Sequence, residues 1–402
     1  MANGFPPELT SARLNYEMAT ELSERGHRVR VVTVLPRARY VASPWAYSGR
    51  IFHHEPINKR LSVLRVGLRL NLSEGLFGRA AHYFLAPIWM TVGSLVSPRS
   101  DVILCESPPL LAGIAAYFVS KVKRVRFTVR IQDIHPDVLE ETGVVRNRFL
   151  ISLMRSIERF VYAKAVLVTT ISPTYRERII SKGVPPEKVK CIPNWADDSF
   201  LLPATDRTPE AEPDLKKNFT VTYAGTMSWF QDLETVVEAA NLVQRNSEIQ
   251  FLMIGDGAIK KNLLERAEAL SLRNISFLPF QPREVYYSVL KASDICLVSL
   301  KKSVTAPEMP SKVLEIMMVG TPLLANVPEK SDISRVVIEA DCGLVVEPEE
   351  PKALADSILW LYQNRQGLKR FGINGRRYAL ANFSLKASVD AFETVLKTVI
   401  QS

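Results

Sequence analysis

Apolar residues recur along the chain with two alternating periods, and this alternation predicts strands and helices in turn. In the first half, short β-branched runs predict strands, and runs with an apolar residue at every third or fourth position predict helices. The predicted strands are 29–35, 62–68, 102–105, 126–131 and 165–170. The predicted helices are 8–25, 76–96, 111–122 and 149–163. Strands that alternate with helices over short connections are typical of a parallel sheet covered on both faces.

The second half repeats this pattern after an interruption. Residues 200–217 combine acidic, proline and small polar residues, which predicts a linker or a surface loop. Strands are then predicted at 219–224, 249–254, 275–277, 295–299, 322–326 and 343–346. Helices are predicted at 233–246, 258–270, 283–292, 311–319, 331–340, 351–363 and 385–400. The chain is therefore predicted to be an α/β protein with two doubly wound domains, 1–198 and 199–384, and a final helix (385–402) that packs back on the first domain.

The chain opens on a helix, where a doubly wound domain is expected to open on a strand. Only Met1 to Phe5 precede the turn at Pro6 and Pro7, and the predicted helix 8–25 follows directly. We therefore expect the central first strand to be truncated.

The length and the charge of the chain limit the classes of protein to which it can belong. A chain of 402 residues with 47% hydrophobic and 23% charged residues fits two globular domains. The net charge of +9 is uneven, because residues 1–200 hold 28 basic and 17 acidic residues and residues 201–402 hold the remaining 23 and 25. The basic half favours an anionic partner, although a merely solvated basic face is the alternative. No zinc-finger or RRM motif accompanies the charge, so we expect no nucleic acid.

Cysteine spacing and hydropathy bear on the compartment. The four cysteines lie at least 46 residues apart, which indicates neither a disulfide scaffold nor a zinc site and favours a reducing, cytoplasmic location. The longest apolar run, 83–96, is shorter than the roughly 20 residues that cross a bilayer. It predicts a buried or an interfacial helix. Arg65, Arg69 and Arg79 flank this run, which suggests peripheral contact with an anionic inner leaflet.

The sharpest candidate site is the predicted start of helix 311–319. Pro310 suits the entry to a helix and Gly320 its end. The backbone amides of Ser311 and Lys312 would form an anion site, to which the Lys312 ammonium adds a charge for phosphate. Glu315 lies one turn further, where a carboxylate can accept both hydroxyls of a ribose. The alternative is that Lys312 and Glu315 form a merely exposed i,i+3 pair.

Other strand-to-helix loops are weaker candidates. Gly225 would let the backbone approach a ligand, and Asp232 suits the start of the next helix, but an ordinary tight turn is the alternative. The segment 255–257 (Gly-Asp-Gly) lacks the third glycine of a dinucleotide fingerprint, so a simple turn is favoured. After strand 126–131, Asp133 and His135 could orient a sugar or stabilise charge, or else cap the loop.

Taken in order, these motifs resemble family 4 of the retaining glycosyltransferases, the group 1 enzymes with the GT-B fold, over nearly the whole chain. The landmarks are Phe5-Pro6-Pro7-Glu8, residues 24–29, Cys191-Ile192-Pro193-Asn194-Trp195, the Gly225 loop, Ile254-Gly255-Asp256-Gly257, and Pro310-Ser311-Lys312 through Gly320-Thr321-Pro322. The similarity is greatest to bacterial surface-polysaccharide enzymes of the O-antigen, capsule and colanic-acid type. It implies two Rossmann-like domains that face a central cleft.

The resemblance also implies roles for individual residues. A nucleotide-sugar donor, UDP-linked or similar, would bind the second domain through Gly225, Thr226, Phe280, Pro310, Ser311, Lys312 and Glu315. Within this set Glu315 corresponds to the ribose ligand, Ser311 and Lys312 to the diphosphate site, and Phe280 to the segment beside the base. Asp133, His135 and Lys312 are the implied catalytic residues, and the loop 7–11 would approach the donor. Such enzymes retain anomeric configuration, need neither a metal nor a cofactor, and in this branch use a glycan or polyprenyl-diphosphate-linked acceptor.

The chain departs from the family pattern at several positions. Proline occupies position 307, where the family has the first glutamate of its Glu-x7-Glu pair, and Glu308 is one residue out of register. Thr226 replaces an arginine or asparagine, Asp232 a common glycine, and Ser11 a glycine of the N-terminal loop. Two alternatives stay open: a nucleotide-sugar 2-epimerase of the same fold, and a catalytically degenerate scaffold at a membrane. The incomplete glycine fingerprint disfavours a dehydrogenase.

Overall fold

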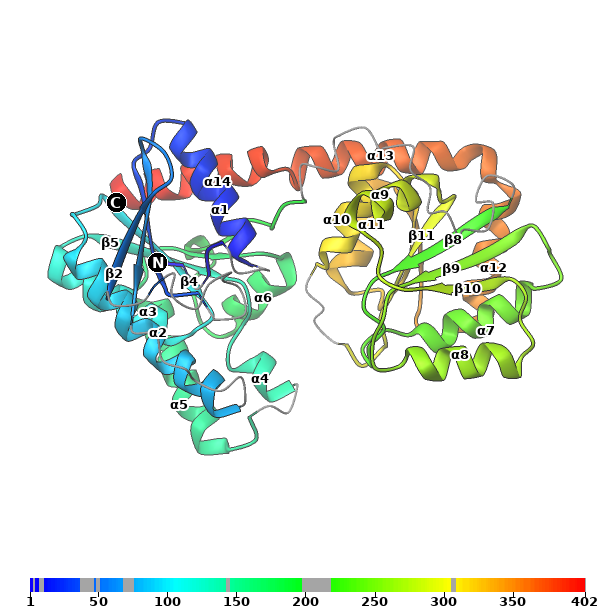
Figure 1. The fold of residues 1–402 in the computed structure, drawn as a ribbon, viewed down its shortest axis with the longest axis horizontal. Coiled ribbons are helices and arrows are strands. Elements are labelled where there is room, and N and C mark those ends of the chain that lie inside the picture. The colour runs from blue at the N-terminus through cyan, green and yellow to red at the C-terminus, as the bar shows by residue number, and fades with distance from the viewer. Residues whose placement is uncertain are drawn as a thin grey trace. The chain divides into compact units, whose positions relative to one another are not determined.

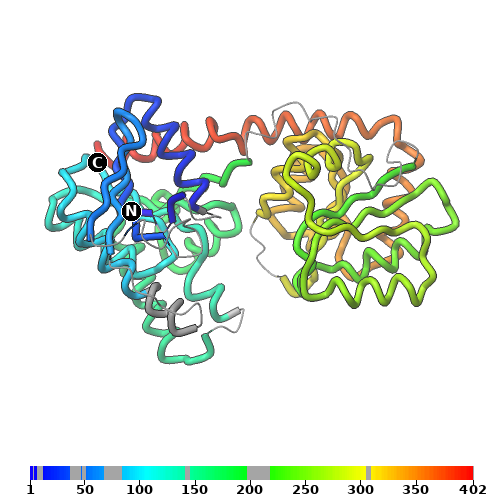
Figure 2. Tube along the Cα trace, viewed as in Figure 1, coloured from blue at the N-terminus to red at the C-terminus, as the bar shows by residue number. Residues whose placement is uncertain are grey.

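The chain divides into two compact units. The computed structural model describes residues 1–2, 4–6, 11–36, 47, 51–67, 76–141, 145–196, 218–304 and 309–401. One unit comprises Met1–Asn194 with Ser388–Ser402, and the other comprises Trp195–Ala387. Figure 2 traces the chain from blue to red, and its red C-terminal end belongs to the first unit. The linker expected at 200–217 lies outside the described residues.

A six-stranded parallel sheet forms the centre of the second unit, in the order β10-β9-β8-β11-β12-β13 (Figure 1). The strands are β8 (Phe219–Ala224), β9 (Ile249–Ile254), β10 (Ile275–Leu278), β11 (Ile295–Ser299), β12 (Leu323–Asn326) and β13 (Gly343–Val346). From β8 the chain first extends the sheet to one side through β9 and β10, and then returns to place β11 on the other side of β8. Such a reversal of strand order opens a crevice at the carboxyl ends of the two strands that flank it.

Helices cover both faces of this sheet. They are α7 (Leu233–Val243), α8 (Lys260–Ala269), α9 (Arg283–Ala292), α10 (Ser311–Val319), α11 (Asp332–Ala340), α12 (Pro351–Gln363), the short 3-10 helix η4 (Arg365–Gly367) and α13 (Leu368–Asn382). Successive strand residues enter opposite cores: Phe251 and Met253 pack with α7, α8 and α12, whereas Leu252 and Ile254 pack with α9, α10 and α11. Burial on both faces explains why these strands are continuous apolar runs in the sequence.

The first unit contains two sheets. One has three strands in the order β1-β3-β2, and the other has four parallel strands in the order β4-β5-β6-β7. The strands are β1 (Val29–Val34), β2 (Phe52–Pro56), β3 (Leu61–Val66), β4 (Val102–Ser107), β5 (Arg126–Ile131), β6 (Val168–Thr170) and β7 (Val189–Cys191). The sequence did not predict β2, an antiparallel strand at the sheet edge that is exposed along most of its length and ends at a proline.

The first two residues of the chain lie between the two sheets. The Ala2 amide donates to the Val32 carbonyl of β1 at 3.1 Å, and the Met1 carbonyl accepts from the Glu106 amide of β4 at 3.1 Å. The Met1 ammonium donates to the Leu104 carbonyl at 2.7 Å, and its burial lowers its pKa. Met1 and Ala2 thus bond to both sheets, in the position where a shortened central strand was expected.

Helices of the first unit include the apolar segment that the sequence emphasised. They are α1 (Ser11–Glu24), α2 (Leu76–Val96), α3 (Leu111–Lys123), α4 (Asp137–Glu141), α5 (Arg148–Lys164), α6 (Pro173–Ser181) and the 3-10 helix η2 (Pro186–Lys188). The α2 helix packs on the first sheet, since a Cβ added at Gly93 would come within 2.9 Å of Val32 and 2.7 Å of Val66. The described part of the chain contains no helix whose length and hydropathy would suit a membrane span.

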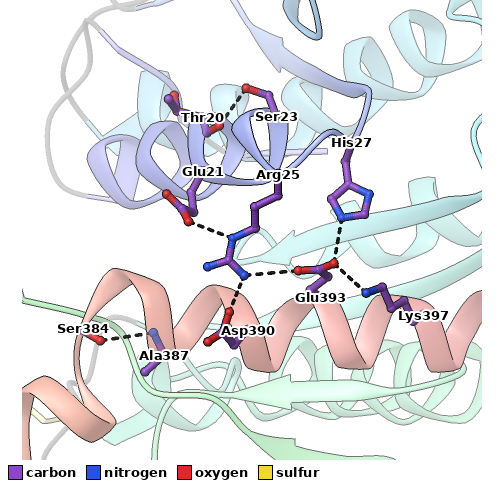
Figure 3. A network of polar contacts seen from close by, with 10 residues as sticks. All are labelled: Thr20, Glu21, Ser23, Arg25, His27, Ser384, Ala387, Asp390, Glu393 and Lys397. Carbon is purple, nitrogen blue, oxygen red and sulfur yellow. Dashed lines mark hydrogen bonds and ion pairs between the residues drawn. The ribbon is translucent and has the colours of Figure 1, made fainter.

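Charged side chains hold the C-terminal helix α14 (Leu385–Gln401) against the first unit (Figure 3). The Glu393 carboxylate lies 2.7 Å from Lys397 Nζ, 3.2 Å from His27 Nε2 and 3.2 Å from an Arg25 guanidinium nitrogen. Arg25 also pairs with Asp390 of α14. Hydrogen bonds from Lys397, His27 and Arg25 lower the pKa of Glu393 to about 2. The last helix is therefore anchored to the turn between α1 and β1.

Candidate functional site

Two loops at the carboxyl edge of the six-stranded sheet are locked together by close backbone contact. The Gly225 amide, after β8, donates to the Ile254 carbonyl of β9 at 2.9 Å. A Cβ added at Gly255 would lie 1.9 Å from the Gly225 carbonyl oxygen, and one at Gly257 would lie 2.2 Å from the Met227 carbonyl oxygen. Both glycines adopt positive φ angles, +140° and +154°. Packing of one loop on the other thus accounts for the Gly-Asp-Gly motif as a turn.

Lys312 extends from the first turn of α10 towards the Gly225 loop. Its Nζ donates to Tyr223 Oη at 3.3 Å and lies 4.6 Å from the centre of the Tyr223 ring. A Cβ at Gly225 would come within 3.1 Å of this nitrogen, so the glycine leaves room for the ammonium. Tyr223 Oη in turn donates to the Thr226 carbonyl at 2.7 Å. Gly225, Thr226 and Lys312 are therefore brought together, with Tyr223 as the residue that joins them.

The Lys312 ammonium is a cation that is largely shielded from water. Burial lowers the pKa of Lys312 to about 8, and the charge of Glu315 opposes this shift. No carboxylate among the described residues lies within ion-pair distance of Lys312 Nζ. A desolvated ammonium that faces a tyrosine hydroxyl and a glycine instead of a carboxylate is suited to receive an anionic ligand.

The start of α10 has the geometry that the sequence predicted. Pro310 is the N-cap in extended conformation, and Gly320 ends the helix in the left-handed region with φ of 80°. The first amides of a helix have no acceptor within it and point along its axis, and the Ser311 side chain is exposed beside them. Because α10 follows β11 and Lys312 contacts the end of β8, this helix start lies at the reversal of strand order.

Glu315 contacts a different partner from Lys312. The Tyr286 hydroxyl of α9 donates to Glu315 Oε2 at 2.8 Å, and burial together with the Glu315 charge raises the pKa of Tyr286. Lys312 and Glu315 are both half-buried and contact different tyrosines, which does not fit a merely exposed i,i+3 pair. Held by Tyr286, the carboxylate has a defined orientation in which it can accept hydrogen bonds from hydroxyl groups.

Phe280 lies in the next loop along the sheet edge, after β10. Its ring is 59% exposed. The loop is joined to its neighbour because the Gly255 amide donates to the Leu278 carbonyl at 3.0 Å. The Gln281 side chain donates to the Pro279 carbonyl at 3.0 Å. Phe280 is thus an exposed aromatic ring on a braced loop, and its place beside a base stays a prediction.

Asp232 joins loops of the second unit to one another. Its side chain is buried and accepts hydrogen bonds from the Thr235 hydroxyl at 2.8 Å, the Asn326 amide at 3.0 Å and the Glu349 backbone amide at 2.7 Å. Asp232 occupies the N-cap position of α7, as expected, but its carboxylate does not bond to a helix amide. Its role is therefore structural, and it replaces a glycine with a carboxylate that links α7 to β12 and to the start of α12.

Sequence reasoning missed the two tyrosines that position the charged residues. Tyr223 and Tyr286 lie inside a predicted strand and a predicted helix, where tyrosine is common in a core. No local signal in the sequence distinguishes these two tyrosines from core residues.

Asp133 and His135 follow β5 in the first unit, and both are half-buried. Burial lowers the pKa of His135, while the Asp133 carboxylate acts in the opposite direction. Burial thus favours the neutral imidazole over the imidazolium. Asp137, two residues further, is buried and pairs with Arg178 at 2.7 Å and Lys182 at 2.8 Å. Asp137 thus stabilises the fold, whereas the roles of Asp133 and His135 stay predictions.

Some candidate positions cannot be placed. Residues 7–10 of the N-terminal loop, the side chain of Ser11, Pro307 and Glu308 lie outside the described residues. Within the described ranges no group of three or more His, Cys, Asp or Glu side chains is arranged to hold a metal ion.

The sequence matches two family models. The model "Glycosyl transferase 4-like domain" covers residues 11–195, and "Glycosyl transferases group 1" covers residues 205–378. The chain is 27% identical over 368 residues to WcaI of Escherichia coli, a protein named as a colanic acid biosynthesis glycosyl transferase, with 88% of this chain and 89% of that protein aligned. It is 23% identical over 399 residues to the alpha-D-kanosaminyltransferase of Streptomyces kanamyceticus, with 95% and 98% aligned.

Solved structures show the same fold. HepE from Anabaena, crystallised in complex with UDP, matches with a TM-score of 0.62 at 18% identity, over 84% of this chain and 86% of HepE. WaaG, described as a glycosyltransferase involved in lipopolysaccharide biosynthesis, matches with a TM-score of 0.56 at 14% identity over 98% of both chains. These likenesses identify two Rossmann-like domains of the GT-B type.

Proposed function

The chain belongs to the group 1 glycosyltransferases, and from this premise we propose that it transfers a sugar from a UDP-sugar to a glycan acceptor. The observation that carries the donor is the Lys312 ammonium, desolvated beside Gly225 at the start of α10. An anion completes that arrangement, and a nucleotide sugar offers its diphosphate. The complexes of HepE with UDP and with UDP-glucose support the choice of nucleotide.

We assign the contacts of the donor to residues of the second unit. The diphosphate would accept hydrogen bonds from the first amides of α10, at Ser311 and Lys312, and from the lysine ammonium. Gly225 and Thr226 would form the opposite wall, close to the phosphates because glycine has no side chain. Glu315 would accept the ribose hydroxyls, in the orientation that Tyr286 imposes. Phe280 would lie against the base.

Transition-state stabilisation is the main chemical contribution that we assign to this site. As the glycosidic bond of the donor breaks, negative charge gathers on the departing diphosphate. The helix amides and Lys312 are fixed in place before this charge develops, so little reorganisation accompanies the step. Retention of anomeric configuration then requires that the acceptor attack from the face the diphosphate leaves. Asp133 and His135 would orient the sugar or the acceptor hydroxyl, and we expect neither a metal nor a cofactor.

We assign the reaction to bacterial surface-polysaccharide synthesis. The relatives support this, because they include WcaI, named for colanic acid biosynthesis, and an Escherichia coli O-antigen chain mannosyltransferase, 19% identical over 266 residues. The acceptor would be a polyprenyl-diphosphate-linked glycan at the inner face of the cytoplasmic membrane. The excess of basic residues in the first half of the chain favours contact with such an anionic membrane surface.

A donor screen tests this proposal. The purified protein is incubated with a panel of nucleotide sugars and a lipid-linked acceptor, and the mass of the acceptor is followed. Transfer by the wild type, and its reduction by at least about 100-fold in Lys312→Ala, is the expected result. Conversion of a nucleotide sugar without any acceptor would favour the epimerase instead. Neither conversion nor nucleotide binding across the panel would favour the scaffold.

A further inference from the structure

The α5 helix of the first unit presents apolar side chains to solvent on the face opposite its core. Phe149 is 80% exposed, Leu153 48% and Phe160 36%. The spacing i, i+4 and i+11 aligns these three residues along one side of the helix, and Leu150, 38% exposed, lies beside them. We call these four residues the α5 stripe. Ile151 and Tyr162 on the opposite side are buried, so the stripe is not part of the core of this unit.

A row of arginines runs beside the α5 stripe. Arg148, Arg155 and Arg159 are exposed and follow the spacing i, i+7 and i+11, which places them along one flank of the same helix. The helix contains a single acidic residue, Glu158, which is buried and pairs with Lys182 at 2.6 Å. The exposed charge that α5 itself contributes is thus entirely positive.

Glu140 of α4 is an exposed acid beside this row, and it pairs with Arg155 at 2.6 Å. Both side chains of this pair are about half exposed, so the pair is screened by water and holds the arginine only weakly. The neighbouring helix α3 adds further exposed apolar residues, Phe118 and Val122, 51% and 57% exposed. The Phe160 ring meets Tyr117 of α3 at 5.0 Å between centroids. The helix layer formed by α3 and α5 therefore exposes apolar surface on both members.

The sequence indicated a different surface for membrane contact, beside the apolar segment 83–96. Arg65, expected to flank an interfacial helix at 83–96, is buried, pairs with Glu55 at 2.8 Å and donates to the Pro6 carbonyl. It cannot reach a partner outside the fold. Within α2, Ala86 and Met90 are buried against the first sheet, whereas Phe84, Ile88 and Val96 are 56%, 58% and 61% exposed, so α2 also presents apolar surface. Arg69 and the side chain of Arg79 lie outside the described residues.

We propose that the α5 stripe and its arginine row dock the protein on a bilayer rich in anionic phospholipid, with α5 lying in the plane of the headgroups. This surface deepens the proposed function, since it supplies the membrane contact that a lipid-linked acceptor requires. Phenylalanine and leucine enter the boundary between headgroups and acyl chains, while arginine binds lipid phosphates. A single-sign charge row beside an apolar ridge complements a surface of uniform negative charge, whereas most protein interfaces pair charges of both signs.

Vesicle co-sedimentation tests the proposal with the full chain. We expect the wild type to bind vesicles of phosphatidylglycerol and phosphatidylcholine at least about tenfold more tightly than vesicles of phosphatidylcholine alone. Added salt should weaken this binding, because it screens the attraction. Equal binding to both vesicle types, or no binding to either, overturns the proposal.

Two double variants identify the surface. Phe149→Ser with Leu153→Ser removes apolar area, and Arg148→Glu with Arg159→Glu reverses the charge row; each is expected to lower binding at least about tenfold. The matched controls lie in the second unit: Ile338→Ser, at a side chain that is 65% exposed, and Lys352→Glu, at an exposed lysine. The controls should bind as the wild type does. Unchanged binding in both double variants contradicts the assignment.

The same samples separate this proposal from the donor site and from self-association. UDP titration of the double variants should match the wild type, because α5 carries none of the donor residues. If the wild type does not bind UDP, the proposed function is wrong, whereas vesicle binding can still be observed. If instead the double variants abolish a concentration-dependent dimer seen by ultracentrifugation, and no vesicle binding occurs, the stripe is an interface between copies and the membrane proposal is wrong.

Discussion

Lys312 has the two properties that a lysine needs to act on a departing phosphate. Its ammonium is held 3.3 Å from Tyr223 Oη by a contact within the second unit, so less side-chain freedom is lost on binding a ligand. It is also shielded from water, which strengthens its attraction for a negative charge. The cost of that shielding is visible in its pKa, which burial lowers to about 8. A bound diphosphate would reverse the shift, because an adjacent anion favours the charged form.

The lowered pKa predicts that UDP affinity depends on pH. As the pH rises through about 8, Lys312 loses its proton and with it the charge that attracts the diphosphate. Affinity of the wild type is therefore expected to fall by up to about tenfold between pH 7 and pH 9. Calorimetric titration with UDP at several pH values measures it.

Lys312→Arg is the control for this experiment, since a guanidinium stays charged over the whole range. The UDP affinity of this variant should change with pH only through the titration of the nucleotide itself. If wild type and variant lose affinity in parallel, the Lys312 ammonium does not take part in binding UDP.

The sequence indicated the charged residues of the candidate site but not the tyrosines that contact them. Pro310 and Gly320 delimit α10 through local chemistry, so the positions of Ser311, Lys312 and Glu315 on its first turns could be predicted. Tyr223 lies 89 residues before Lys312, and Tyr286 lies 29 residues before Glu315. Which tyrosine meets which charge depends on the order of strands in the sheet, and a local pattern does not specify that order.

Among the elements, the packing of the β9 loop on the β8 loop is the most sensitive contact near the site. Gly255→Ala would place a Cβ 1.9 Å from the Gly225 carbonyl oxygen, so one of the two loops must move. We expect a loss of about 3 kcal/mol in stability and weaker UDP binding. Thermal unfolding and UDP titration are the measurements.

Gly183→Ala provides the matched control, because Gly183 has φ of +90° and no atom within 4 Å of an added Cβ. It isolates the backbone strain of a positive φ, about 1 kcal/mol, from the clash. Equal losses in the two variants would show that the loops do not depend on their close approach.

The anchor of α14 predicts a local effect of Glu393→Gln. The change keeps the shape of the side chain and removes the charge that Lys397, His27 and Arg25 share. Amide hydrogen exchange in α14 should become severalfold faster, with Glu268→Gln on the exposed face of α8 as control. Unchanged exchange in α14 would contradict the role of the network.

The pH dependence of this anchor has a defined sign. The pKa of Glu393 is lowered from 4.5 to about 2 in the fold, so its contribution to stability is present above pH 4.5. The contribution is lost as the pH falls from there towards about 2. The charge of Glu393 therefore persists at the anchor through mildly acidic conditions.

Elements were predictable from the sequence where strands are buried in the sheet, and α13 was missed because glycines are needed for its close packing. The four inner strands of the second unit, β9, β8, β11 and β12, are buried on both faces, and all six strands lie where expected. The α13 helix was missed because Gly372 and Gly375 lower its helix propensity. A Cβ at Gly372 would lie 2.0 Å from the Gly320 carbonyl oxygen. The glycine that obscures the helix is thus required for its packing on the end of α10.

For the whole molecule, the duplication of the doubly wound pattern predicted the fold, and the charge difference between the halves suggested an anionic partner for the first half, which stays a prediction. Where in that half such a contact would lie was harder to predict. The longest apolar run drew attention to 83–96, which packs on a sheet through one side and exposes Phe84 and Ile88 on another. Phe149, Leu153 and Phe160 are separated in the sequence by polar residues, so only their helical spacing together with their exposure identifies the α5 stripe.

Titration calorimetry with UDP on the full chain shows whether the start of α10 binds the diphosphate of a nucleotide donor. The wild type is expected to bind UDP with micromolar affinity. Lys312→Ala should weaken it by about 10- to 100-fold, the usual effect of losing one charge-assisted hydrogen bond, and Lys352→Ala on α12 should leave it unchanged. Absence of UDP binding in the wild type, or equal affinity in Lys312→Ala, would contradict this assignment of the diphosphate site.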